Sequence, residues 1–158
     1  MSQPRLTYDA FAKIAPVAQQ SLIAMGRQAD DSGVDKQIVE LVKLRVSQLN
    51  NCAFCLQIHL NVARKLGLPQ EKLDLVATWE EAGIFSEREC AALAWAETLT
   101  RLVGHSISND AYESVRRHFS EEEVTFLSVA IATINAWNRL GAAFRFAPPI
   151  LRGAKAVS

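Results

Sequence analysis

The chain has 158 residues, 49% of them hydrophobic, which suits one ordinary globular domain whose core needs no disulfide for stability. Its 17 basic and 17 acidic residues are interspersed, which excludes the charge patterns typical of nucleic-acid and acidic-membrane binding. Because no signal-peptide pattern and no bilayer-length apolar run is visible, and the cysteine count is odd, we expect a cytoplasmic protein in a reducing environment.

Helical spacing of apolar residues runs through the sequence, and no segment alternates with the period of a strand. In chain order, the predicted helices cover residues 8–29, 34–49, 52–66, 70–82, 86–102, 110–119 and 120–146. Pro16 is expected to interrupt the first helix, and Ser86 and Ser120 each begin a capping box. Pro148 and Pro149 are expected to end the last helix, with residues 152–158 loose beyond it. The sequence therefore predicts one all-α domain over residues 1–158, a bundle of about six to seven helices.

A Cys-x-x-Cys pair, Cys52 and Cys55, is followed by His59 at the start of one predicted helix. Helical geometry places the three side chains on the same apolar face, where they can touch. A helix N-terminus stabilises a thiolate, and an imidazole can exchange its proton near neutral pH. Two cysteines one turn apart can also close a disulfide without chain movement. The pattern therefore indicates a thiol redox centre.

Glu40 lies on the preceding helix, which is apolar over most of its circumference, in a narrow polar strip with Lys43 and Ser47. One interpretation is a half-buried acid that orients His59 or passes a proton to it through water. The other is an exposed ion pair of Glu40 with Lys43, one turn later, on a solvated face. Both interpretations remain open from the sequence.

Two other uses of the cysteine pair must be weighed. The first is a disulfide exchanger or redox sensor, in which the same two thiols are oxidised by a protein disulfide. The second is a structural zinc module with Cys52, Cys55, His59 and Glu40 as ligands. Three of these four side chains come from two turns of one helix, and no second ligand pair follows in the sequence. We therefore expect no metal and no other cofactor.

Other polar or reactive residues suggest structural roles. Cys90, behind the Ser86 capping box, is interpreted as a core thiol. Asn135, Asn138 and Arg139 interrupt the apolar pattern of the last helix. We expect them to satisfy buried backbone groups or to contact another subunit.

The pattern Glu40-x11-Cys52-x2-Cys55-x3-His59 resembles the alkylhydroperoxidase D / carboxymuconolactone decarboxylase-like superfamily. The segments LRVSQLNNC, FSERE and INAWNRL are similar to its cysteine-bearing peroxidase branch, and the resemblance covers about residues 10–147. It implies an all-helical fold and a homo-oligomer, a trimer or hexamer, with sites near subunit contacts. It also implies peroxidase activity on organic hydroperoxides and H2O2, with an external dithiol as reductant.

By position, the resemblance makes Cys55 the thiol that becomes sulfenic acid and Cys52 the proton donor and resolving thiol. His59 and Glu40 would form the proton relay. The helix dipole alone favours Cys52, nearer the helix start, as the more acidic thiol. The best-known peroxidase of the family has a histidine where this chain has Phe54, so one polar group of that relay is missing here. The decarboxylases of the superfamily lack the cysteine pair, so lactone decarboxylation is not expected.

Overall fold

The computed structural model describes residues 3–150, which form nine α-helices, one 3-10 helix (η1) and no strand. The elements are α1 (Tyr8–Ile14), α2 (Pro16–Asp30), α3 (Lys36–Leu49), α4 (Ala53–Lys65), α5 (Gln70–Leu75), η1 (Val76–Thr78), α6 (Trp79–Ala82), α7 (Glu87–Thr100), α8 (Asn109–Arg116) and α9 (Glu121–Phe144). The predicted all-α fold is confirmed. None of these described helices has the length and apolar character needed to cross a membrane. The predicted loose tail, residues 152–158, lies outside the described part of the chain.

The helices are more numerous than the predicted six to seven because two predicted helices are broken. The expected break before Pro16 divides α1 from α2, and Pro16 takes the first position of α2. The single helix predicted over residues 70–82 is wrong, because the chain tightens into η1 at Val76. This tighter turn buries Val76 completely and lets Trp79 Nε1 donate to Glu97 Oε1 at 3.0 Å.

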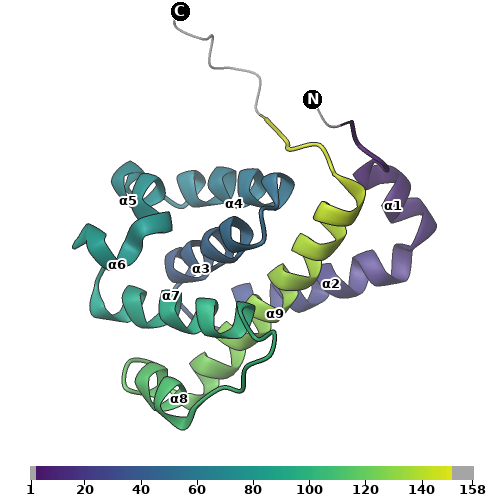
Figure 1. The fold of residues 1–158 in the computed structure, drawn as a ribbon. Coiled ribbons are helices and arrows are strands. Elements are labelled where there is room, and N and C mark those ends of the chain that lie inside the picture. Colours follow the sequence, from purple (N-terminus) through teal and green to yellow (C-terminus); the bar gives the residue numbers. More distant parts are fainter. Residues whose placement is uncertain (1–2, 151–158) are drawn as a thin grey trace, which may run out of the picture.

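Helix α3 is the central helix of the fold and packs against α4, α7 and α9 (Figure 1). Its apolar side chains belong to three separate core clusters. Val42 and Val46 face the cluster of α7 and α9, Leu41 and Leu44 face α4 and α5, and Val39 faces the end of α2. Because apolar neighbours surround α3, its polar strip is buried as well. Buried polar groups are costly unless they are hydrogen-bonded to one another.

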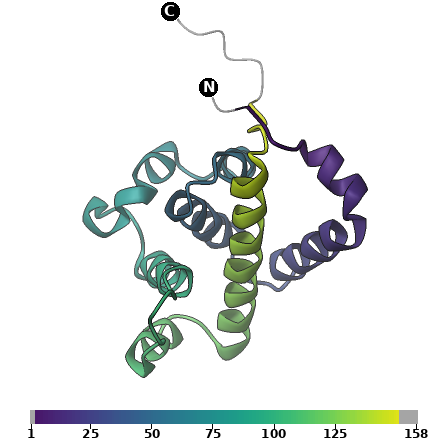
Figure 2. The same ribbon diagram turned by 45° about the vertical axis from the view of Figure 1, so that its right-hand side comes forward.

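Helix α9 separates the N-terminal pair α1 and α2 from the rest of the bundle, as Figure 2 shows with α9 in green to yellow. The predicted end of this helix at residue 146 is wrong by two residues. Arg145 adopts a left-handed conformation (φ 54°, ψ 52°), and the backbone N–H of Phe146 turns back to donate to the Gly141 carbonyl at 3.3 Å. This turn, ahead of Pro148, buries Phe146 beside Phe54.

Candidate redox site

The cysteine pair lies where α3 turns into α4. Asn51 supplies the left-handed residue of the turn (φ 52°), a conformation that asparagine tolerates better than most residues. Cys52 is the N-cap of α4, and its Sγ accepts the backbone N–H of Cys55 at 3.3 Å. The two sulfurs form a disulfide with a Cα–Cα distance of 5.4 Å, and both cysteines are 3% exposed. The pair therefore occupies the helix N-terminus that thiolate chemistry favours.

A line of four ionisable side chains, here named the charged chain, joins α2, α3 and α4. It consists of Asp30, Lys43, Glu40 and His59. Lys43 Nζ donates to Asp30 Oδ1 at 2.6 Å and to Glu40 Oε1 at 3.0 Å. The other oxygen of Glu40, Oε2, lies 2.8 Å from His59 Nδ1. Glu40 is 4% exposed and Lys43 is 7% exposed, so the interpretation as an exposed ion pair is wrong. Glu40 is also more deeply buried than the alternative of a half-buried acid supposed.

The electrostatics of the charged chain keep its central pair ionised. Burial raises the pKa of Glu40, but the hydrogen bond and charge of His59, followed by the charge of Lys43, outweigh it and leave that pKa below its ordinary value. Burial lowers the pKa of Lys43, and the charge of Glu40 together with the Asp30 contact overcomes this and raises it. Because Glu40 is a carboxylate, the proton it shares with His59 resides on Nδ1. Nε2 of His59 is then the nitrogen that can exchange a proton.

A cavity of about 520 Å³ opens beside the disulfide, between α2, α4 and α9. Its lining is mainly apolar and includes Cys55, Tyr8, Phe54, Ile58, Ile134 and Trp137. His59, Lys43 and Asp30 also line it. The cavity thus brings one sulfur of the pair and the charged chain to one apolar space, which is large enough for a small organic molecule.

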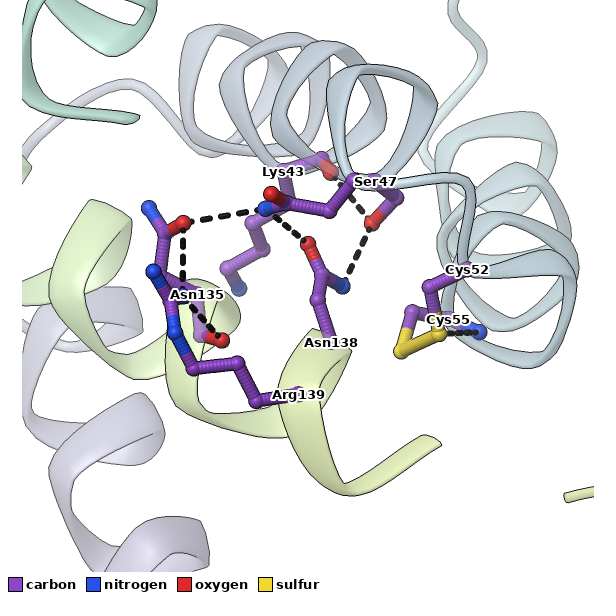
Figure 3. The surroundings of a disulfide bond; sticks show 8 residues. Lys43, Ser47, Cys52, Cys55, Asn135, Asn138 and Arg139 are labelled. Atoms are coloured by element: carbon purple, nitrogen blue, oxygen red, sulfur yellow. Dashed lines mark hydrogen bonds between the residues drawn. A yellow bond between two sulfur atoms is a disulfide. The ribbon is translucent and has the colours of Figure 1, made fainter. Parts of the chain in front are cut away.

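A second polar group, here named the amide cluster, joins α3 to α9 and consists of Ser47, Asn50, Asn135 and Asn138. Figure 3 shows Ser47, Asn135 and Asn138 near the disulfide. Asn50 Nδ2 donates to the side-chain oxygens of Asn135 and Asn138, at 2.9 Å each. Asn138 Nδ2 donates to Ser47 Oγ at 3.2 Å, and Ser47 Oγ donates to the Lys43 carbonyl. The expected role of the asparagines in satisfying buried groups fits these contacts, which lie within one chain.

Sequence reasoning missed two residues of the site. Asp30 lies just beyond the helix predicted over residues 8–29, yet it is the last residue of α2 and the outer partner of Lys43. Gly141 was given no role, yet a Cβ atom at this position would lie 2.7 Å from Cys52 Sγ and 3.4 Å from Cys55 Sγ. The backbone of α9 therefore contacts the disulfide directly. The available signal was a glycine inside an apolar helix, which costs stability unless another backbone or group approaches closely.

The zinc alternative receives no support from the described residues, where no group of three or more His, Cys, Asp and Glu side chains is arranged to hold a metal ion. The two sulfurs are bonded to each other, and Glu40 is bound to His59 and Lys43. Cys90 is a free thiol on α7 and is partly rather than fully buried. Burial, followed by the charge of Glu89, raises the pKa of Cys90, so it is a weak nucleophile at neutral pH.

Comparison with known proteins agrees with this geometry. Residues 16–98, just over half of the chain, match the carboxymuconolactone decarboxylase family. The chain belongs to this family. Within it, the chain is 34% identical over 134 residues to the uncharacterized protein YdfG of Bacillus subtilis, covering 85% of this chain and 91% of YdfG.

Solved structures of other proteins have the same fold. A protein of unknown function from Agrobacterium tumefaciens matches with a TM-score of 0.87 and 35% identity. Its name suggests an antioxidant defence role as AhpD. The match covers 94% of this chain and 100% of that one. An uncharacterized peroxidase-related protein from Ralstonia eutropha, described as an alkylhydroperoxidase AhpD core, matches with a TM-score of 0.76 and 22% identity over 88% of this chain and 74% of that one. This family member therefore has the alkylhydroperoxidase D-like fold, and it carries a Cys-x-x-Cys pair.

Proposed function

We propose that the protein is a thiol-dependent peroxidase that reduces organic hydroperoxides and H2O2 through the Cys52–Cys55 pair. The observation that carries the proposal is the placement of Cys55 and His59 on one apolar cavity of about 520 Å³, with Cys52 one helical turn away. The apolar lining suits the organic part of a hydroperoxide, whose O–O bond would meet Cys55 in the wall of the same cavity.

In the proposed cycle, Nε2 of His59 takes the proton of the Cys55 thiol, and the thiolate attacks the hydroxyl oxygen of the hydroperoxide, so that the O–O bond breaks. His59 supplies a proton to the departing alkoxide, which leaves as an alcohol, and Cys55 becomes a sulfenic acid. Cys52 then attacks the Cys55 sulfur, so that a disulfide forms and water leaves. An external dithiol returns both sulfurs to thiols. The carboxylate of Glu40 holds the imidazole of His59 in the tautomer that this proton transfer needs.

The assignment of Cys55 as the attacking sulfur rests on access. The backbone contact favours Cys52, because its Sγ already accepts the N–H of Cys55 and a thiolate there would accept it more strongly. Cys55, however, lines the large cavity together with His59. A thiolate must meet its substrate to react, and we give the position on the cavity more weight than the hydrogen bond.

The test is the loss of cumene hydroperoxide in the presence of dithiothreitol, measured for the wild type and for Cys55→Ser. We expect Cys55→Ser to fall to the rate of the dithiol alone. Cys90→Ser is the matched control, because it removes a thiol whose raised pKa keeps it protonated, and it should retain the wild-type rate. Equal rates in the wild type and Cys55→Ser would contradict the proposal.

A disulfide exchanger or redox sensor would use the same pair, and the oxidised state of Cys52 and Cys55 is compatible with it. The two functions differ in the preferred oxidant. A peroxidase is oxidised faster by cumene hydroperoxide than by a protein disulfide, and an exchanger shows the reverse order. The mainly apolar lining of the cavity beside Cys55 favours the small hydroperoxide.

We further propose that the chain assembles into a homo-oligomer, a trimer or hexamer. Apolar side chains remain exposed on two parts of the surface, with Val103 at 88% and Ile14 and Val17 each at 74% exposure. Exposed apolar patches of this kind are typical of contact surfaces. Sedimentation equilibrium would test the assembly, and a monomeric mass at micromolar concentration would contradict it.

A further inference from the structure

The two cysteines of the disulfide line different depressions of the surface. Cys55 lines the cavity of about 520 Å³ described above. Cys52 instead lines a second depression of about 400 Å³, and the described residues around each space include one of the two cysteines but not the other. The second depression is formed by the start of α4 and the end of α9, with Asn51, Phe54, Gly141, Arg145, Phe146 and Pro148 among its lining residues. The redox pair is therefore approached from two sides.

Access from two sides matters because of the geometry of thiol–disulfide exchange. An incoming thiolate attacks one sulfur from the side opposite the sulfur that leaves, so the open side decides which sulfur is attacked. From the second depression, the sulfur within reach is Cys52 Sγ, and Cys55 is then the leaving sulfur. Cys55 would leave as a thiolate beside the N-terminus of α4, on the cavity that also holds His59.

The charges of the two spaces also differ. Asp30, Lys43 and His59 line the larger cavity. Arg145 is the single charged side chain among the described residues that line the second depression. It is exposed, and it holds a left-handed backbone conformation that is uncommon for residues other than glycine and asparagine. An exposed cation at this position favours an incoming anion, and the attacking form of a thiol is an anion.

We propose that the second depression is the site where the reducing dithiol docks, and that its thiolate attacks Cys52. In this step a bond forms between the reductant sulfur and Cys52 Sγ, the Cys52–Cys55 bond breaks, and Cys55 leaves as a thiolate. The second thiol of the reductant then attacks the reductant sulfur of the mixed disulfide. Cys52 is released and takes up a proton, the dithiol becomes a disulfide, and two electrons have passed to the protein.

The second depression serves the reductive half of the proposed peroxidase cycle. That electrons flow from the dithiol to the protein rests on the proposed peroxidase function. The surface is assigned to a small, preferably anionic dithiol or thiol, because Arg145 is its one charged lining residue among those described. The hydroperoxide and the reductant would thus meet the same pair of sulfurs without competing for one space.

The direct test maps the first mixed disulfide on the wild-type protein. The oxidised protein is mixed with 2-mercaptoethanesulfonate for a short time and quenched with N-ethylmaleimide, which blocks the sulfur that has just left. Trypsin releases both cysteines in the peptide of residues 46–64, and its fragment ions place each modification. We expect the thiol adduct on Cys52 and the maleimide on Cys55. The reverse pattern, or an equal mixture of the two, would overturn the inference.

A second test separates the two half-reactions with one substitution in each space. Ala142→Phe adds bulk at an exposed residue of the second depression, and Gly26→Leu adds bulk in the larger cavity. Stopped-flow Trp fluorescence follows oxidation by cumene hydroperoxide and reduction by dithiothreitol. We expect Ala142→Phe to slow reduction relative to oxidation about tenfold, and Gly26→Leu to shift the ratio in the opposite direction. Equal slowing of both half-reactions by either variant would contradict the assignment.

The variant Arg145→Asn tests the role of the charge. It removes the cation but keeps a residue that tolerates the left-handed conformation. The wild type should react faster with 2-mercaptoethanesulfonate than with cysteamine when thiolate concentrations are matched. The variant should lose roughly two- to fivefold of this preference, the range of an exposed charge pair. An unchanged preference would remove Arg145 from the proposal. Since reduction needs no peroxide, these tests can fail while the peroxidase function stands, and they can succeed if it does not.

Discussion

The charged chain and the amide cluster begin on the same polar strip of α3. They differ in charge and in whether their side chains line the larger cavity. Glu40 and Lys43 lead to the charged chain, which ends in His59 and Asp30 on the wall of a cavity. Ser47, one turn further along α3, leads to the amide cluster, where Asn138 is completely buried. One group can gain and lose protons beside an apolar space, whereas the other consists of neutral side chains that do not line this cavity.

This difference separates a site from its scaffold although both contain buried, hydrogen-bonded side chains. A neutral amide group fixes the distance between helices, here α3 and α9, through the Ser47–Asn138 bond. An ionised group with an open end can deliver a proton, and it retains its charge only because its partners outweigh burial. Substitutions in the first group should therefore change stability, and substitutions in the second should change rates.

The largest expected effect is that His59→Gln slows the oxidation of the protein by cumene hydroperoxide. The amide of glutamine can still donate to Glu40, but it cannot carry the proton that the departing alkoxide needs. We expect the rate of oxidation by cumene hydroperoxide to fall about 100-fold or more, with little change in the free energy of unfolding. The measurement is single-turnover oxidation by cumene hydroperoxide, followed by stopped-flow Trp fluorescence. A wild-type rate in the variant would remove His59 from the relay.

The opposite pattern is expected for Asn138→Leu, the matched change in the amide cluster. It removes a buried side chain that donates to Ser47 and accepts from Asn50, and we expect the free energy of unfolding in urea to fall by about 1–3 kcal/mol. The oxidation rate per folded molecule should stay at the wild-type value. A variant with unchanged stability but slower oxidation would place the amide cluster in the chemistry and break the comparison.

Two glycines on opposite sides of the site give a matched pair of smaller effects. At Gly141 an added Cβ would lie 2.7 Å from Cys52 Sγ, so Gly141→Ala should destabilise the oxidised protein by about 1–3 kcal/mol. At Gly26 the nearest atom is Thr133 Cγ2 at 3.9 Å, so Gly26→Ala should stabilise α2 by up to about 1 kcal/mol. Urea unfolding of both variants under oxidising conditions measures the difference. The same sign for both would show that the disulfide does not need the bare backbone of α9.

Local spacing was enough to predict the core of the site. Residues 52, 55 and 59 fall on one helical face whatever surrounds the helix, and the paired asparagines before Cys52 indicate the end of the preceding helix. The capping boxes at Ser86 and Ser120 were predicted for the same reason, and both are present. Each of these features depends on a few residues that are neighbours in the sequence, so local sequence alone predicts it.

The features that were missed depend on how helices pack against one another. The burial of Glu40 follows from apolar clusters around all of α3, and helical periodicity along α3 alone shows only its own polar strip. Asp30 joins Lys43 because α2 and α3 meet across a turn, and Gly141 reaches the disulfide from a helix almost ninety residues further along the chain. The end of α9 at Arg145 likewise serves the burial of Phe146, a contact that the following prolines do not reveal.

The smallest expected effect is the share of Glu40 in the pH dependence of stability. Its pKa in the folded protein lies below the ordinary value of 4.5, so at pH values between the two the unfolded chain binds the extra proton. Stability from this group is therefore complete above about pH 5 and is lost as the pH falls through the folded pKa. One group contributes at most about 1.4 kcal/mol per pH unit. Glu40→Gln should be less stable than the wild type at pH 7, because Lys43 loses its buried partner.

The gap between the wild type and Glu40→Gln should narrow as the pH falls from about 5 to 3, as measured by urea unfolding at several pH values. Other carboxylates with lowered pKa values, such as Glu97, titrate in both proteins and cancel in the difference. If the difference in the free energy of unfolding stayed constant from about pH 5 to 3, Glu40 would contribute to stability through its packing rather than its charge. In that case the charged chain would resemble the amide cluster, and the distinction between site and scaffold would rest on His59 alone.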